Sequence, residues 1–266
     1  MKKILIKSNL ILLMSSLVVP SLTLAQSFSM ATQIEAGSNL YAEKQYNRSA
    51  GQRLSFSPNY ELAKNWQTSG TLTISQDTVS PARTTLENTS LSLSYTGYKL
   101  GIFDLKNKLL GTLPTRQESW DSEKYKGSLG FGTDLSIASQ YGILPNSATL
   151  GLSGHRNFHE FTQNAEGSPN IQNSLRTSLA FGWQLTSNLN FGVFAAYRLA
   201  RTYEESIRNS FISSANLAYS LSKKLNIYGG TSLGERAAFK SNGSDSNISL
   251  FDDNHSEIFA GLTYIL

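Results

Sequence analysis

Hydrophobic and polar residues alternate along most of this chain. The cleanest run places Leu189, Phe191, Val193, Tyr197 and Leu199 on one set of positions and Asn190, Gly192, Ala196 and Arg198 on the other. The same dyad recurs at 178–185 and 211–221, and less regularly at 53–62, 90–96 and 128–137. Because successive strand side chains point to opposite faces, this pattern predicts many strands with one apolar face each.

Assigning a strand to each run gives about twelve strands. Their approximate ranges are 28–41, 52–62, 66–77, 88–98, 104–114, 124–138, 147–159, 174–186, 188–201, 209–221, 224–237 and 255–266. Short turns alternate with longer polar connections at 42–51, 78–87, 115–123, 160–173, 202–208 and 238–254. This rhythm is typical of a membrane barrel with short turns in the periplasm and long loops outside.

The second face of these strands is small and polar, whereas a soluble sandwich would fill it with bulky apolar side chains. The sequence therefore predicts an all-β fold, a closed up-and-down antiparallel transmembrane β-barrel of about twelve strands. Pro58 lies inside the second predicted strand, where its missing N–H breaks a ladder bond unless a bulge intervenes. The alternation is weakest at 99–114. Ten and fourteen strands stay open as alternatives.

The N-terminal residues have the pattern of a cleavable secretory signal. Lys2, Lys3 and Lys7 precede an apolar stretch from Leu10 to Val19, and small residues lead to Ala25. We expect cleavage after Ala25, which leaves residues 26–266 as the barrel. The alternative is a retained membrane helix, but the run is shorter than the roughly 20 apolar residues a spanning helix needs.

Composition narrows the function classes further. The chain has no cysteine, which excludes disulfide scaffolds, thiol nucleophiles and Cys-based metal sites. It has 23 basic and 19 acidic residues, and the predicted leader removes three lysines and no acid, so the remainder is close to neutral. The basic balance therefore gives no support to a nucleic-acid partner. The apolar fraction is 39%, and no segment after the leader matches a membrane helix.

The last predicted strand carries a resemblance to a known class. One face of this strand is formed by Ile258, Ala260, Leu262, Tyr264 and Leu266. This strand resembles the C-terminal assembly signal of Gram-negative outer-membrane proteins, which the barrel assembly machinery recognises, although the usual final aromatic residue is replaced by leucine. With the leader and the strand number, the chain resembles the twelve-stranded channel and porin-like class. That class also includes lipid-hydrolysing enzymes, so the fold alone does not decide the function.

Strand phase predicts which charged side chains line the lumen. The predicted pore-lining residues are Glu35, Arg53, Glu61, Asp134, Arg176, Arg198 and Arg236. If the four arginines face the three acids, they set a transverse field that orients polar solutes and tunes ion selectivity. Alternatively, acids and bases form salt bridges between adjacent strands and stabilise the wall.

Two other groups of residues have side chains that could carry chemistry. Ser153, His155 and Asn157 share one face of the seventh predicted strand and could in principle activate a hydroxyl for lipid hydrolysis. Their order does not match the outer-membrane phospholipases, and their face is predicted to be the lumen. His155, His159 and His255 lie near the predicted outer rim, and Asp245, Asp252 and Asp253 lie in a polar loop. Neither set has the spacing of a metal site, and no metal or other cofactor is predicted.

These patterns favour a non-enzymatic outer-membrane channel for passive diffusion of small polar solutes or ions. The alternatives are a structural or surface-interaction barrel that acts through its extracellular loops, and an outer-membrane lipid hydrolase. The expected partners are outer-membrane lipids, the barrel assembly machinery and a small polar solute. The expected location is the outer membrane after export.

Overall fold

The computed structural model describes residues 27–40, 48–79, 83–138, 145–238, 248, 251–252 and 255–266. The predicted leader lies outside the described residues, as do Asp245 and Asp253. The strands are β1 (Phe28–Asn39), β2 (Ala50–Ala63), β3 (Trp66–Asp77), β4 (Thr84–Leu86), β5 (Thr89–Leu100), β6 (Phe103–Leu113), β7 (Tyr125–Ala138), β8 (Ser147–His159), β9 (Ile171–Gln184), β10 (Leu189–Thr202), β11 (Ile207–Ser220), β12 (Leu225–Ala237) and β13 (Ser256–Ile265). One helix, α2 (Gln117–Asp121), lies between β6 and β7.

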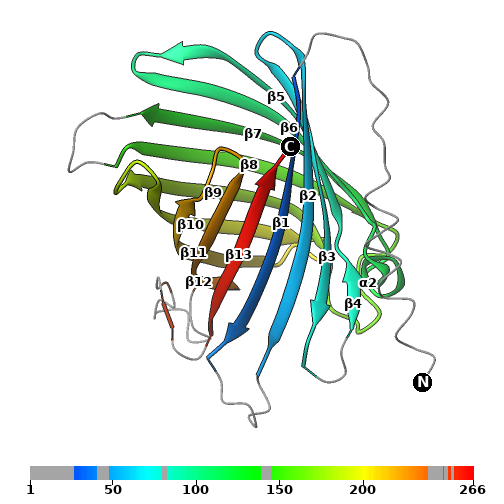
Figure 1. The fold of residues 1–266 in the computed structure, drawn as a ribbon. Helices are drawn as coiled ribbons and strands as arrows, with labels where there is room; N and C mark the ends of the chain where they lie inside the picture. The colour runs from blue at the N-terminus through cyan, green and yellow to red at the C-terminus, as the bar shows by residue number, and fades with distance from the viewer. Residues whose placement is uncertain are drawn as a thin grey trace.

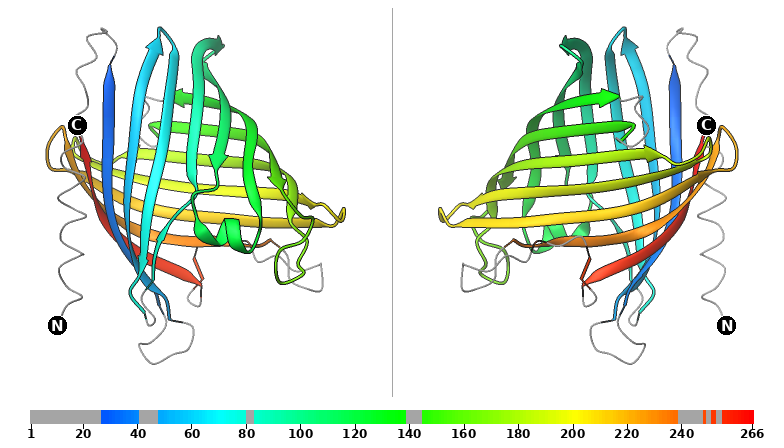
Figure 2. Two further views of the ribbon diagram at one scale, coloured as in Figure 1. Left: turned by 90° about the vertical axis from the view of Figure 1, so that its right-hand side faces the viewer. Right: turned by 90° about the vertical axis from the view of Figure 1, so that its left-hand side faces the viewer.

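The long strands form one closed antiparallel barrel. Neighbours in the chain pair around the whole wall, and β1 pairs with β13, so that the first and last strands close the sheet (Figures 1 and 2). The short strand β4 pairs with one half of β3, and β5 pairs with the other half. The prediction of an up-and-down barrel with twelve strands is confirmed, with β4 as one extra short strand. Among the described residues, no helix is long and apolar enough to cross a membrane.

The connections also follow the predicted rhythm, with one difference. The tight turns use left-handed residues, Asn65 with φ 69° between β2 and β3 and Gly101 with φ 63° between β5 and β6. The β10–β11 connection, predicted as one of the long loops, spans only residues 203–206 between its strands. Its Glu205 has φ 66°, which closes a compact turn. We call the two ends of the barrel the short-turn end and the long-loop end; α2 lies at the long-loop end (Figure 1).

Pro58 is accommodated without the expected bulge. The β2–β3 register is the same on both sides of it, with Phe56 opposite Leu72 and Asn59 opposite Ser69. The residue that faces Pro58 in this register is Gly70, and even a Cβ added to Gly70 would lie 4.0 Å from Pro58 Cγ. The proline ring is therefore not crowded from β3, and β2 continues past it without a change of register.

The outer face of the barrel is apolar and exposed. Leu129, Phe131 and Leu109 are 59%, 58% and 55% exposed. Aromatic rings gather on this face near the short-turn end, in the groups Trp66–Tyr95–Tyr98 and Phe181–Trp183–Phe191. An apolar band bordered by aromatic rings is what a lipid-facing wall requires.

The last strand presents its regular apolar series to this outer face. Leu262 and Tyr264, 45% and 43% exposed, belong to the face that also carries Ile258 and Ala260. The N–H of Leu266 donates to the carbonyl of Met30 on β1 at 3.0 Å. Four residues of the predicted assembly signal therefore belong to the strand that closes the barrel and Leu266 follows its end, while their recognition by assembly machinery stays a prediction.

Candidate functional site

The inner face of the wall is identified by cavities whose lining comes from many strands at once. One cavity of about 240 Å³ is lined from β6 to β12, by Thr112, His155, Arg176, Arg198 and Glu235 among others. Side chains of so many strands can meet only on the concave side of the sheet. The intervening apolar positions lie on the other face, where leucines such as Leu150 and Leu175 are exposed. Small, polar and charged residues therefore line the lumen.

Two arginines stand side by side on this inner face. Arg176 on β9 and Arg198 on β10 are direct cross-strand partners. Arg198 Nη1 donates to both carboxylate oxygens of Glu235, at 2.9 and 3.2 Å, and Ser210 Oγ donates to the same carboxylate at 2.5 Å. The Arg176 guanidinium lies 5.6 Å from the ring centroid of Phe194. We call Arg176, Arg198 and Glu235 the arginine cluster.

A second group of charges centres on Glu35 of β1. Arg53 Nη1 lies 3.5 Å from Glu35 Oε1, and Tyr228 Oη donates to Glu35 Oε2 at 3.1 Å. Tyr228 reaches Glu35 across Gly261, which is the register partner of both residues, and accepts a hydrogen bond from Gln33 Nε2. The same part of the lumen is lined by Asp77, Glu87 and Glu257. We call Glu35, Asp77, Glu87 and Glu257 the carboxylate cluster.

The two arginines lie across the barrel from Glu35, whereas Glu235 on β12 stands one strand from Glu257 on β13. In the closed strand order, β9 with Arg176 is the fifth strand from β1 with Glu35. The basic side holds two arginines around one carboxylate, and the acidic side holds four carboxylates around Arg53. The lumen therefore carries a charge difference across its width. The division differs from the predicted one, because Arg53 stands among the acids.

Other predicted pore-lining residues are paired locally. Asp134 on β7 forms a salt bridge with Lys108 on β6, and both side chains are partly buried, with 22% and 28% exposed. Glu61 shares the face of Arg53 and lies at the short-turn end, where its carboxylate accepts a bond from Ser27 Oγ at 2.8 Å. The Glu35–Arg53 and Lys108–Asp134 contacts both join adjacent strands. The alternative of salt bridges that stabilise the wall thus describes part of the lumen.

Arg236 is placed differently from the other predicted lumen charges. The β11–β12 register shifts between Phe211 and Ser213, because β12 contains one extra residue at this point. Beyond this bulge Arg236 is the partner of Phe211, on the outer face, and binds Asp252 at 2.7 Å, while Glu235 turns inward. A bulge changes the phase of every later residue in the strand, which simple alternation does not anticipate.

Sequence reasoning also missed several lumen residues. Glu235 was hidden by the same bulge, while Glu257 and Tyr228 stand in phase with polar positions and could have been found by strict alternation. Lys108, the partner of Asp134, lies in the stretch 99–114 where the alternation is weakest, and it is not among the predicted pore-lining residues. Glu87 lies between β4 and β5, where Ser75 Oγ donates to its carboxylate at 2.6 Å, and its place inside the lumen follows from a strand interruption that the sequence does not mark.

The Ser153, His155 and Asn157 set shares the inner face but not a hydrogen-bonded geometry. Positions two residues apart on one strand are separated by about 6.6 Å, too far for a serine and a histidine to bond directly. Asn157 Nδ2 donates to the carbonyl of Ile171 at 3.1 Å, which is a wall contact. His159 lies between the rings of Tyr125 and Tyr203, and His255 contacts Asp252. Among the described residues, no group of three His, Cys, Asp or Glu side chains could hold a metal ion.

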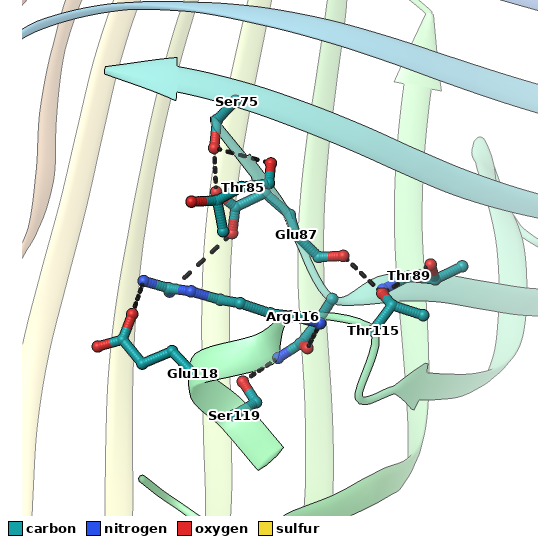
Figure 3. Close-up of polar contacts among 9 residues, drawn as sticks. Ser75, Thr85, Glu87, Thr89, Thr115, Arg116, Glu118 and Ser119 are labelled. Atoms are coloured by element: carbon teal, nitrogen blue, oxygen red, sulfur yellow. Dashed lines mark hydrogen bonds and ion pairs between the residues drawn. The ribbon is translucent and has the colours of Figure 1, made fainter. Parts of the chain in front are cut away.

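The loops at the long-loop end are tied to the wall and to one another. Arg116, before α2, lies between Glu118, 2.5 Å from its Nη2, and Glu87, 4.0 Å from its Nη1 (Figure 3). The backbone N–H of Arg116 donates to Asn88 Oδ1 at 3.0 Å, and Asn88 Nδ2 donates to Ser119 Oγ at 2.9 Å. The β6–β7 connection is thereby fastened to the junction of β4 and β5.

Asn170 joins this loop to the next one. Its Nδ2 donates to the carbonyls of Glu123 at 3.2 Å and Phe161 at 3.1 Å. Its own carbonyl accepts the N–H of Tyr203 in the β10–β11 turn at 3.0 Å. The connections after β6, β8 and β10 therefore form one hydrogen-bonded layer over part of the rim.

Comparison with known proteins agrees at the level of fold. No family model matches the chain, and no curated protein matches it. Among solved structures, the COG4313 outer membrane channel from Pseudomonas putida F1 aligns with TM-score 0.57 and 8% identity, over 90% of this chain and 95% of that one. The NanC porin aligns with TM-score 0.51 and 10% identity, over 90% of this chain and 99% of that one. The chain thus has the barrel fold of outer-membrane channels.

Proposed function

We propose that this protein is a narrow outer-membrane channel for passive diffusion of small polar solutes or ions. The observation that carries the proposal is the polar lumen with Arg176 and Arg198 on one side and the carboxylate cluster on the other. Twelve strands enclose a lumen between that of side-chain-filled eight-stranded barrels and that of wide porins. The shared fold with an outer membrane channel and a porin supports the same role.

The Arg176–Arg198 pair gives this proposal a specific physical basis. Like charges directly opposite on neighbouring strands destabilise a sheet. A wall selected only for stability would avoid such a pair, and one carboxylate, Glu235, balances only one of the two charges. Local conflicts of this kind are typical of functional sites. We infer that the pair attracts anionic groups, while the opposite carboxylates attract cationic ones.

The charge difference across the lumen also suggests how a solute would pass. A dipolar solute in a field across the pore lowers its energy by aligning with it, so it enters in one orientation. Ions of both signs find a favourable side of the lumen, so we expect modest rather than absolute selectivity. Arg176 is the residue to test first, because its charge has no direct carboxylate contact among the described ion pairs, whereas Arg198 is bonded to Glu235.

Conductance in planar lipid bilayers tests the proposal. The refolded protein should give ohmic conductance, and Arg176→Glu should shift the reversal potential in a KCl gradient toward that of potassium. Lys126→Glu is the matched control, because Lys126 binds Glu160 at 2.9 Å in the loop layer and contacts no charge of the lumen clusters in the described residues. A folded barrel that never conducts would overturn the channel proposal. If Arg176→Glu conducts with the same ion selectivity as the wild type, the arginine cluster does not set the selectivity of the channel.

A surface-interaction barrel is the second candidate, favoured by the hydrogen-bonded loop layer. Trp120 and Phe161 stand on this layer with 49% and 57% of their surface exposed. Exposed aromatic side chains on an ordered surface are suited to binding a partner protein. This candidate predicts that Trp120→Ala with Phe161→Ala abolishes adhesion of cells to a surface or host protein while bilayer conductance stays unchanged.

A further inference from the structure

We propose that the outer face of β8–β11, at the long-loop end, binds one phosphorylated glycolipid with the chemistry of lipid A. Two arginines would bind its phosphates, and an apolar groove below them would hold an acyl chain. The inference concerns the lipid side of the wall and does not require the lumen to conduct. From the proposed function it takes only the placement of the long loops on the outer side of the membrane.

The headgroup side of the site is a row of polar residues across three strands. Arg156 on β8 is the register partner of Asn173 on β9, and Asn173 is the partner of Arg201 on β10. All three belong to the outward phase, since Leu152, Leu175 and Leu199 on the same faces are 51%, 49% and 41% exposed. Arg156 Nη1 donates to Asn173 Oδ1 at 3.4 Å. The row thus presents two guanidinium groups at the rim.

The spacing of the two arginines indicates a headgroup with two phosphates. Neighbouring strands lie about 4.8 Å apart, so two strand intervals separate the arginine backbones by about 10 Å. Guanidinium groups bind phosphate through paired hydrogen bonds. Arg201 also binds Glu205 at 2.8 Å, but that carboxylate is 77% exposed, and exposed ion pairs of this kind contribute little. A phosphate can therefore compete for Arg201.

The groove lies two to three register rows below the arginines on the same outer face. The next row pairs Gly154, Leu175 and Leu199, and the following rows contain the groove residues. The groove is lined almost entirely by apolar or small side chains, including Thr177, Leu179, Ala195, Tyr197, Phe211 and Ile248.

The shape of the groove follows from the sizes of its residues. Small residues at its floor, such as Ala195 and its partner Ser213, leave a depression beside the larger Leu179 and Tyr197, while Phe211 is itself buried in a cluster with Leu233 and Ala238. Elsewhere on the outer face, Leu129, Phe131 and Leu152 project from the wall. An apolar depression on β9–β11, two to three register rows from two cations on the same face, is the arrangement that an amphiphile with an anionic head would fill.

The test measures lipid binding to the refolded protein in detergent micelles by native mass spectrometry. The probes are hexa-acylated lipid A with two phosphates, the same lipid after removal of both phosphates, and dioleoylphosphatidylglycerol. The site variants are the double change Arg156→Gln with Arg201→Gln, and Ala195→Phe, which fills the groove floor. The matched control is Lys223→Gln with Lys224→Gln, two cations at the short-turn end. Folding of each variant is checked by its heat-modifiable gel shift.

We expect one bis-phosphorylated lipid A per barrel, with affinity reduced about tenfold or more by the double arginine change and by removal of the phosphates. The lysine control should bind as the wild type does, and Ala195→Phe should also bind more weakly. Equal binding of lipid A and phosphatidylglycerol, or unchanged binding by the arginine variant, would overturn the headgroup assignment. Unchanged binding by Ala195→Phe would overturn the assignment of the groove as the acyl-chain site. If a variant does not fold, the phosphate-free lipid on the wild-type barrel decides the headgroup assignment.

Discussion

Replacing Gly261 by alanine should destabilise the barrel wall between β12 and β1. Gly261 is the one residue over which the Tyr228 side chain passes to reach Glu35. A Cβ at this position would fall on the Tyr228 hydroxyl group and would lie 2.5 Å from the carbonyl oxygen of Ile34. The tyrosine ring can turn away, but the Ile34 carbonyl belongs to the β1 backbone and cannot move without distorting the ladder.

The expected cost has two parts. Overpacking against a fixed backbone typically costs about 1–3 kcal/mol. Displacing Tyr228 also removes a hydrogen bond to a carboxylate, which contributes about 1.5–3 kcal/mol where water is excluded. Glu35 remains 19% exposed and keeps Arg53, so only part of the second cost applies. We therefore expect a total of about 2–4 kcal/mol, and about 1–2 kcal/mol for Tyr228→Phe alone.

Urea unfolding in lipid vesicles, followed by tryptophan fluorescence, measures this free energy. Gly111→Ala is the control, because the nearest atom to its added Cβ, other than those of its chain neighbours, is the Ser128 carbonyl oxygen at 3.9 Å. The control should change stability by less than about 1 kcal/mol. If Gly261→Ala unfolds at the same urea concentration as Gly111→Ala, the close passage of Tyr228 over Gly261 is not a constraint and the reasoning fails.

Three further changes test other contacts. Asp134→Asn should lower the free energy of unfolding by about 1–2 kcal/mol, because it leaves the partly buried Lys108 without its carboxylate. Adding Lys108→Met to this variant should recover most of the loss. If Asp134→Asn costs the same free energy with Lys108 as with Met at position 108, the pairing is contradicted. Asn170→Ala should speed proteolytic cleavage of the long-loop end in proteoliposomes without changing urea unfolding, since it removes one hydrogen bond to the β6–β7 connection, at Glu123, and one within its own loop, at Phe161; an unchanged cleavage rate would contradict the loop layer. The hydrogen bond and charge of Lys126 lower the pKa of Glu160, so this ion pair is present at neutral pH and is lost as pH falls through that pKa. In an NMR titration, Lys126→Ala should raise the pKa of Glu160. A Glu160 pKa that is the same in Lys126→Ala and in the wild type would contradict the contact.

Strand alternation predicted the architecture well because the lumen and lipid environments impose opposite chemistry on the two faces. The run 189–199 became β10 with its residues in the expected phase, and Phe194, an apolar residue among the lumen-facing positions, lies near Arg176. Even the weak alternation at 99–114 became the regular strand β6. In such a wall each side chain must suit either the lipid or the lumen, so the local sequence is enough to predict the strands and their two faces.

Features that depend on partners in other strands were not predictable from one strand. The bulge that turns Glu235 inward and Arg236 outward is defined by the pairing of β12 with β11. The passage of Tyr228 across Gly261 needs the register of three strands. Likewise, the grouping of carboxylates around Arg53 follows from barrel closure, which brings β13 beside β1. The sequence contains these residues but not the registers that join them.

Pairing of β1 with β13 also has a consequence for how the barrel comes apart. The register from Ala31 opposite Ile265 to Asn39 opposite Glu257 joins the two extremes of the described chain. Opening this seam in a bilayer would expose two rows of backbone N–H and C=O groups to hydrocarbon, at a cost of several kcal/mol for each unsatisfied group. Intermediates with a partly opened wall are therefore steeply disfavoured. We expect unfolding to be slow and all-or-none, so the lifetime of the inserted barrel is governed by a kinetic barrier at this single seam.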